Sequence, residues 1–343
     1  MLKQKWLHQR YRDIQRWEDS CVYEDFINDR QIIDLIQEKQ DPDKYEVLDI
    51  IDKARYNATS GTMLSPGDVA ILANTTDPQI WEEIFETADW IKTTVYGNRI
   101  VLFAPLYLSN ICVNNCLYCV FKTTNTSLQQ KILDVDEIVA EVQALVNTGH
   151  KRLIAVYSEH PQSDANYICQ SIDTIYSVHF DCGEIRRCNI NASPMFVPEY
   201  RQIRDVGIGT YQIFQETYHH ATYENVHPAG TLKNRYKWRL FGLHRALEAN
   251  IDDIAIGVLF GLYDWKFELL GLLYHAMSLE KEFGIGPHTI SYPRLVHAEN
   301  APLTTHSKYR VSDDDFAKNC CHNTSYVPVY RIYFNCQRTI SFA

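Results

Sequence analysis

The sequence predicts an α/β protein whose larger part is a barrel, or part of a barrel, of parallel strands. From residue 99 onward, apolar runs of strand length alternate with amphipathic segments of helix length. Strands that alternate with helices form a parallel sheet, and right-handed crossovers curl such a sheet into a barrel. The chain has 343 residues, an ordinary size for one α/β barrel, and its hydrophobic fraction of 45% is sufficient for a core.

Residues 1–95 are predicted to form a helical extension in front of the barrel. Ser65 followed by Pro66 is typical of a helix start, because serine caps the first amides and proline fits the first turn. Apolar residues recur with helical spacing over 24–39, 45–56, 67–73 and 80–95.

The barrel is expected over residues 96–318. Its six predicted strands cover 99–109, 151–158, 184–191, 209–216, 252–260 and 287–295. The helices between them are expected near 135–148, 163–177, 197–205, 230–249 and 265–283. Since barrel enzymes have their active sites at the carboxyl ends of the strands, we expect the functional side chains there.

Charge and hydropathy argue against several classes of protein. The net charge of −10 disfavours a nucleic-acid binder, which usually has a basic face. No apolar run is long enough for a membrane span, and the N-terminus lacks the apolar core of a secretory signal. We therefore expect a cytoplasmic protein that binds neither nucleic acid nor membrane, with an organelle matrix as the alternative location.

Ten cysteines without a secretory signal favour metal binding or buried thiols over disulfides. Cys112, Cys116 and Cys119 share one short loop with the spacing C-x3-C-x2-C, and Tyr118 precedes the last of them. Three thiolates can hold three irons of a [4Fe–4S] cubane, which leaves the fourth iron open. A structural zinc site needs a fourth protein ligand, and no Cys or His follows within the next 25 residues. Buried thiols are expected at Cys169, Cys182 and Cys188.

This motif is that of the radical S-adenosylmethionine (SAM) superfamily, and the surrounding sequence resembles one family within it. The similarity, from about Glu24 to Phe316, is to the radical SAM tyrosine lyases of [FeFe]-hydrogenase maturation, with the thiamine-pathway tyrosine lyases as the nearest relatives. It implies a TIM-type (β/α) barrel of which six family-like strands are retained, with a [4Fe–4S] cluster and SAM as cofactors. The segments that carry it are 96–119, 207–219, 227–230, 257–276 and 286–295.

The resemblance implies which residues contact SAM. Glu159 matches the family's glutamate for the SAM amino group, although Ser158 stands where the family has glycine. Further SAM contacts are expected at Tyr118 and in a stretch that resembles the family's adenine-binding segment, at Gly257, Leu259 and Gly261.

Polar residues near the ends of the third and fourth strands are candidate ligands. Alternation along a strand directs every second side chain into the barrel. Asn191 and Gln215 are therefore expected to bind SAM or the substrate, with Glu216 as a further SAM contact.

The sixth strand is expected to bind the substrate. A planar guanidinium suits a carboxylate, and the resemblance assigns Arg294 and Ser291 to the carboxylate of L-tyrosine. His288 lies at the start of this strand and should face the opposite end of the barrel. In the maturation enzymes a histidine there helps to hold the extra iron of a second cluster; the alternative is a core histidine with satisfied hydrogen bonds.

The implied reaction abstracts hydrogen from the amino group of tyrosine and then cleaves the Cα–Cβ bond. The products are p-cresol and dehydroglycine (2-iminoacetate), and the implied setting is an anaerobic cell. The implied partners are an electron donor such as ferredoxin or flavodoxin and other hydrogenase maturases. Alternatives are the thiamine-pathway 2-iminoacetate synthase, a lyase of another amino acid such as tryptophan, a non-enzymatic iron–sulfur or zinc protein, and an inactive truncated product.

The resemblance stops near Lys318, and residues 319–343 are unlike the family. Back-translation of 330–339, read one nucleotide later, permits a sequence that resembles the family's seventh strand, so we expect a frameshift and an aberrant tail. The second, C-terminal cluster should then be absent, and with it the formation of carbon monoxide and cyanide. The alternating residues of this tail are still able to pair as a makeshift strand. Sequencing of the gene tests the frameshift.

Overall fold

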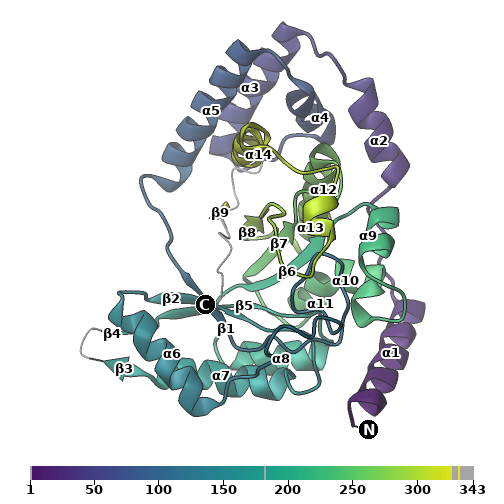
Figure 1. Cartoon of the computed structure of the whole chain (residues 1–343). Helices are drawn as coiled ribbons and strands as arrows, with labels where there is room; N and C mark the ends of the chain where they lie inside the picture. The colour runs from purple at the N-terminus through teal and green to yellow at the C-terminus, as the bar shows by residue number, and fades with distance from the viewer. Residues whose placement is uncertain (1, 181–182, 327–330, 333–343) are drawn as a thin grey trace.

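The protein consists of a curled parallel sheet, helices on its outer face and a group of helices at one end (Figure 1). The computed structural model describes residues 2–180, 183–326 and 331–332. Cys182, Cys336 and most of the predicted aberrant tail lie outside the described residues. No helix within these ranges is both long and apolar enough to cross a bilayer.

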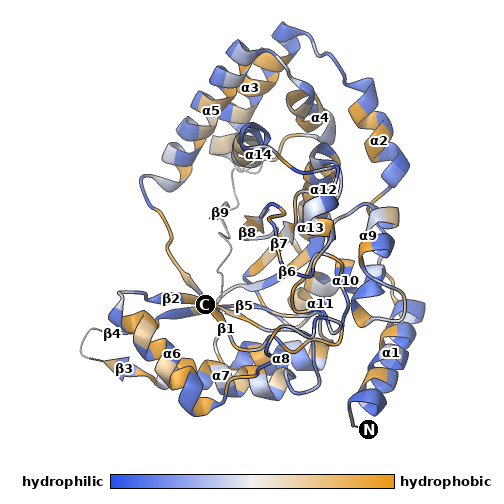
Figure 2. Ribbon diagram, viewed as in Figure 1, coloured by the Kyte–Doolittle hydropathy of each residue, from blue (hydrophilic) through white to orange (hydrophobic). Residues whose placement is uncertain are grey.

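The N-terminal extension is helical, as predicted. Side chains of Asn28, Asp43, Ser65 and Asp77 cap the second to fifth helices, because each accepts a hydrogen bond from a first-turn amide. Along α3 and α5, polar and apolar residues alternate with the helical repeat, as expected of helices with one buried face (Figure 2). The five helices are α1 (Leu2–Ser20), α2 (Asp29–Glu38), α3 (Lys44–Ser60), α4 (Pro66–Asn74) and α5 (Pro78–Tyr96).

Seven parallel strands form the main sheet, in the order β1-β2-β5-β6-β7-β8-β9. All six predicted strands occur, although each is shorter than its apolar run. The carboxyl ends of parallel strands meet at the same edge of a sheet, so the segments after β1, β2, β5, β6, β7 and β8 converge there. The bounds are β1 (Ala104–Tyr107), β2 (Arg152–Val156), β5 (Arg187–Asn191), β6 (Tyr211–Glu216), β7 (Ile254–Val258), β8 (Thr289–Ser291) and β9 (Arg331–Ile332).

Helices connect the strands and bury their apolar faces against the sheet. They share one large core with it, in which Leu153, Ile190, Ile256 and Leu272 are fully buried. The connecting helices are α6 (Val135–Asn147), α7 (Ala165–Ser177), α8 (Val197–Asp205), α9 (His220–Val226), the 3₁₀ turn η1 (Leu232–Asn234), α10 (Tyr236–Leu240), α11 (Gly242–Glu248), α12 (Trp265–Phe283) and α13 (Leu303–His306).

Two expected elements are divided in the structure. The prediction of one strand over 184–191 was wrong: Gly183–Glu184 is β4, which pairs antiparallel with β3 (His179–Phe180), and β5 begins at Arg187. Gly183 has a φ of 122°, a conformation that favours glycine. The expected helix over 230–249 is likewise divided into η1, α10 and α11.

Residues 313–326 and 331–332 take part in the fold. Helix α14 (Asp313–Tyr326) runs past the point where the resemblance ends and packs against α5 and α3. Arg331–Ile332 pairs in parallel with Thr289 and Ile290 of β8, which agrees with the makeshift strand expected for the tail.

His220 attaches the barrel to the start of α2 and to the segment before it. Its Nδ1 lies 2.7 Å from Asp29 Oδ1 and its Nε2 2.9 Å from Asp25 Oδ2. Burial lowers the pKa of His220, but hydrogen bonds to both carboxylates together outweigh burial and raise the pKa to about 9. His219, also beside Asp29, and the ring of Tyr236 are the other groups that face it.

We expect His220→Gln to destabilise the protein most at low pH. The folded pKa lies above the unfolded value of 6.5, so this stabilisation is fully present below pH 6.5 and is lost as the pH rises through about 9. Urea unfolding of wild type and variant at about pH 6 and about pH 10 measures the difference. An equal loss of unfolding free energy at both pH values would show that a charged His220 does not stabilise the fold through Asp25 and Asp29.

Candidate active site

The three motif cysteines lie in the loop that leaves the carboxyl end of β1. Cys116 is buried and its carbonyl accepts a hydrogen bond from Cys119 N at 3.2 Å, which folds the C-x2-C part into a tight turn. Cys112 Sγ accepts from Asn114 N at 3.4 Å. Burial raises the pKa of Cys116 to about 11 and that of Cys119 to about 12.

These thiols fit a cubane cluster better than a single metal ion. Within residues 2–180, 183–326 and 331–332, no three Cys, His, Asp or Glu side chains converge closely enough to hold one ion. In a cubane each thiolate binds a different iron, so the three sulfurs surround the cluster instead of meeting at one atom. Iron also supplies the positive charge that stabilises buried thiolates. Cys112, Cys116 and Cys119 are thus suited to hold a [4Fe–4S] cluster.

Glu159, after β2, lies against the cysteine loop. Its Oε2 accepts a hydrogen bond of 2.6 Å from Asn114 Nδ2, and its carbonyl accepts one of 2.9 Å from Val113 N. Ser158 donates its hydroxyl hydrogen to the carbonyl of Ile111 at 2.5 Å. The serine that replaces the expected glycine therefore ties the end of β2 to the residue before Cys112.

A buried group of charges lies beside the cysteines, and sequence reasoning identified only one member of it. Lys233 Nζ is 2.6 Å from Glu216 Oε1, and Arg239 is 3.6 Å from the same oxygen. Burial dominates the pKa of Cys116, but the charges of all three side chains also act on it, so they lie close to the cluster loop. Glu216 has a φ of 74°, a strained value for a residue other than glycine, and such strain is common at functional sites.

Tyr118 is held in place by His227, which the sequence prediction did not include. His227 Nδ1 is 2.9 Å from the carbonyl of Tyr223 and must carry the hydrogen there, since a carbonyl only accepts. Burial, with the nearby Lys233 and Arg239, lowers the pKa of His227, which keeps the ring neutral. Its Nε2 is then an acceptor, so the Tyr118 hydroxyl donates to it at 2.8 Å.

The expected adenine-binding stretch begins within β7, at Gly257, and continues beyond the carboxyl end of that strand. Leu259 packs with Tyr118 in a small apolar cluster. At Gly257 a side chain would collide with the Phe214 ring and lie 2.7 Å from the Ser291 carbonyl, so packing between strands already requires glycine. Gly261 has a φ of 109°, a turn that favours glycine. The contact with adenine at these three positions stays a prediction.

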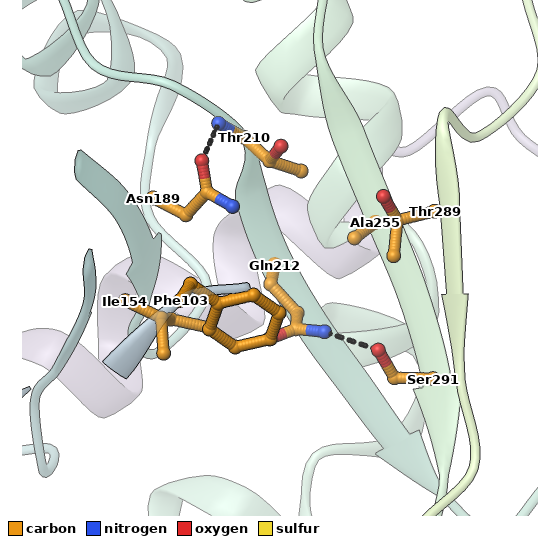
Figure 3. Close-up of a pocket in the computed structure, with 8 residues that line it drawn as sticks. All are labelled: Phe103, Ile154, Asn189, Thr210, Gln212, Ala255, Thr289 and Ser291. Atoms are coloured by element: carbon orange, nitrogen blue, oxygen red, sulfur yellow. Dashed lines mark hydrogen bonds between the residues drawn. The ribbon is translucent and has the colours of Figure 1, made fainter. Parts of the chain in front are cut away.

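A polar chain crosses the inside of the barrel. Asn191 Nδ2 donates to Gln212 Oε1 at 3.3 Å, and Gln212 Nε2 donates to Ser291 Oγ at 2.6 Å. Figure 3 shows Gln212 and Ser291 directed toward one another, with Asn189 bonded to the Thr210 amide nearby. Asn191 and Ser291 were expected to line the site; Gln212, which connects them, was missed. The pocket in Figure 3 is lined by Phe103, Ile154, Asn189, Thr210, Gln212, Ala255, Thr289 and Ser291.

Gln215 lies where strand β6 loses its regular register. The pairing with β7 shifts between Phe214 and Glu216, which is a β-bulge. Gln215 is 2% exposed, and neither amide atom has a hydrogen-bond partner among the described residues. A buried amide of this kind is suited to a polar ligand. Its expected role as a ligand stays a prediction.

Arg294, after β8, is paired with the start of α14. Its Nη1 is 2.5 Å from Asp313 Oδ1, and its guanidinium lies 5.1 Å from the centre of the Phe316 ring. The guanidinium therefore binds a carboxylate here, although that carboxylate belongs to the protein.

His288 lies at the amino end of β8, opposite the cysteines, as the sequence indicated. Its Nδ1 is 3.3 Å from Asp253 Oδ1, and Asp253 also pairs with Arg187. This contact gives His288 a structural partner, one of the two roles that the sequence left open. A role in holding iron stays a prediction.

Comparisons with known proteins identify the family of this chain. Residues 106–270 match the model of the radical SAM superfamily. A crystal structure of HydG, a maturase of the [FeFe]-hydrogenase, superposes with a TM-score of 0.86 at 43% identity, over 90% of this chain and 67% of that one. The chain belongs to the radical SAM superfamily. Its fold is therefore the radical SAM TIM-barrel type that the motif implied.

Two further proteins are similar to this chain over most of its length. HydG from Carboxydothermus hydrogenoformans is 38% identical with a TM-score of 0.76, over 90% of this chain and 71% of that one. The 2-iminoacetate synthase of Escherichia coli (strain K12) is 28% identical over 240 residues, which are 69% of this chain and 62% of the relative. The chain thus spans less than two thirds of that curated relative.

Proposed function

We propose that this chain is a radical SAM lyase that cleaves the Cα–Cβ bond of L-tyrosine to p-cresol and dehydroglycine (2-iminoacetate). The observation that carries the proposal is that the cysteine loop, Glu159 and the two cations beside Glu216, Lys233 and Arg239, meet at one end of the barrel. The chain that builds this site is 43% identical to a HydG. The name of the curated relative, 2-iminoacetate synthase, supports the same product.

The charges around the cysteines complement a zwitterion such as the methionine part of SAM. Glu159 is positioned for its ammonium group, while Lys233 and Arg239 are positioned for its carboxylate. Tyr118 and Leu259 offer an apolar surface to the adenosine part. When bound, the [4Fe–4S] cluster supplies the electron that cleaves SAM and releases a 5′-deoxyadenosyl radical.

The barrel interior offers the tyrosine site. Arg294 binds the substrate carboxylate in place of Asp313, and Ser291 with Asn191 presents polar groups inside the barrel. This arrangement directs the amino group toward SAM and excludes water from the radical. Loss of hydrogen from the amino group allows the Cα–Cβ bond to break. The aromatic fragment becomes p-cresol when it takes up one electron and one proton, and a ferredoxin or flavodoxin is the expected electron donor.

The test is an anaerobic assay of the protein reconstituted with iron and sulfide. SAM, tyrosine and a reductant are added, and p-cresol and 5′-deoxyadenosine are quantified. Both products support the tyrosine lyase. Deoxyadenosine without p-cresol would overturn tyrosine as substrate, and tryptophan is then the next amino acid to assay. Absence of both products would contradict the proposal that this chain is a radical SAM lyase.

We expect Lys233→Ala to weaken SAM binding by about 10- to 150-fold. A hydrogen bond to a charged group contributes about 1.5–3 kcal/mol, which corresponds to that factor. Equilibrium dialysis of SAM with the reconstituted protein measures the Kd. The matched control is Lys53→Ala, which removes a lysine that pairs with Asp68 in the N-terminal extension and should leave the Kd unchanged. Equal affinities of wild type and Lys233→Ala would show that this lysine does not contact SAM.

A further inference from the structure

The first helix is basic in a protein that is otherwise acidic. The net charge of the chain is −10, yet residues 1–16 contain one carboxylate, Asp13, beside Lys3, Lys5, Arg10, Arg12 and Arg16. Arg10 pairs with Glu199 at 2.8 Å and Arg16 pairs with Asp13 at 3.3 Å. Within the described residues, Lys3, Lys5 and Arg12 have no carboxylate partner, and all three are exposed. We call these three side chains the cationic surface of α1.

This helix packs directly on the loop that carries the cysteines. Ile14 of α1 is fully buried in a cluster with Val113, and Trp6 and Leu7 pack against the same cluster. Val113 follows Cys112 in the chain and bonds to the carbonyl of Glu159. The apolar face of α1 therefore packs on a cluster that joins Val113 of the cysteine loop to Leu232 and Trp238, while Lys5 and Arg12 lie on the opposite side of the helix.

The start of α1 acts electrostatically on the segment that follows β2. Burial lowers the pKa of His160, and the positive charge of Lys3 lowers it further, so Lys3 lies near the residue that follows Glu159. The start of α1 thus acts on the segment after β2, while Ile14 further along the helix packs in a cluster with Val113 of the cysteine loop.

We propose that the cationic surface of α1 is the docking site for an acidic electron-transfer protein that reduces the cluster. The inference rests on the proposed function, because reductive cleavage of SAM takes up one electron per molecule, which the carrier loses. Complementary charge accelerates the encounter of two proteins and orients them, and such interfaces are small and weak. Val113, between α1 and Cys112, gives the carrier a short route through packed protein to the cluster.

Other partners suit this surface less well. A basic amphipathic helix binds a lipid surface through its apolar face, and here Trp6, Leu7 and Ile14 are already packed on the barrel. Nucleic acid is disfavoured by the acidic charge of the rest of the molecule. A negatively charged protein can bind through the exposed cations alone, without the apolar face of α1.

The test measures binding rather than catalysis. A fluorescently labelled two-[4Fe–4S] ferredoxin is titrated with the reconstituted protein, and its anisotropy gives the Kd at ionic strengths of about 20 mM and about 300 mM. We expect the triple variant Lys3→Glu, Lys5→Glu, Arg12→Glu to raise the Kd at the lower ionic strength by at least about tenfold, and to abolish its salt dependence. The same variant should slow reduction of the cluster by reduced ferredoxin by a similar factor, while reduction by dithionite stays unchanged.

The matched control reverses three exposed cations elsewhere, with Arg30→Glu, Lys44→Glu and Lys281→Glu on α2, α3 and α12. It has the same net charge as the first variant and should bind ferredoxin like wild type. An equal loss in both variants, an unchanged Kd in the first, or binding of anionic vesicles but not of ferredoxin would overturn the proposal. Anisotropy does not depend on tyrosine cleavage, so failure of the lyase assay leaves this result interpretable.

Discussion

Cys116→Ala is expected to abolish formation of 5′-deoxyadenosine, a loss on the order of 10³-fold or more, because the cluster loses an iron ligand that no neighbouring side chain replaces. Cys116 is buried at the centre of the motif loop, and within the described residues no other cysteine has a spacing that allows it to take over. The visible absorbance of the reconstituted protein and the yield of deoxyadenosine measure the effect.

Cys169→Ala is the control for this substitution. Cys169 is a buried thiol on α7, remote from the motif loop, and its sulfur contacts the carbonyl of Gln202 at 3.5 Å. The variant should keep the cluster and the deoxyadenosine yield of wild type. If Cys116→Ala retained the cluster absorbance, the assignment of the three motif cysteines would be wrong.

Trp238→Ala is expected to lower the free energy of unfolding by about 3–5 kcal/mol, the range for removal of a large aromatic side chain from a core. Trp238 is 1% exposed and lies between α1 and the barrel. Its ring centre is 5.3 Å from that of Trp17 and 4.6 Å from that of Phe196, and the Arg245 guanidinium lies 3.5 Å from it. The substitution therefore removes aromatic and cation–π contacts together with buried area.

Urea unfolding followed by circular dichroism measures this effect. Trp90→Ala on α5, whose side chain is 43% exposed, is the control and should change stability much less. Limited trypsin digestion should also cleave α1 faster in Trp238→Ala than in wild type, because the helix loses its main anchor. Equal digestion rates would show that α1 is held by other contacts.

Residues close together in the sequence were predicted best. Cys112, Cys116 and Cys119 occupy one loop, so their spacing alone predicted them as cluster ligands, and the resemblance indicated Glu159, which lies against that loop. Asn191 was predicted from alternation along its strand and Ser291 from the resemblance, and hydrogen bonds through Gln212 connect the two.

Residues brought in by tertiary packing were missed. Lys233 and Arg239 come from η1 and α10, a region that the pattern presented as one long helix without a special face. The signal that could have identified them is the segment 227–230, which carries His227 and is separated from Lys233 by two residues. The β3–β4 hairpin was missed because strands of two residues have no periodicity to detect.

The hydrogen bond from Tyr118 to His227 has a consequence for the reduction potential. The phenol has one hydrogen, and it is directed to His227 Nε2. That hydrogen is unavailable to the sulfur atoms of a cluster on the neighbouring cysteines, and hydrogen bonds to sulfur are among the factors that set a cluster's potential. By holding this donor away, the neutral imidazole would favour a more strongly reducing cluster at these cysteines, which is the property that cleavage of a sulfonium demands.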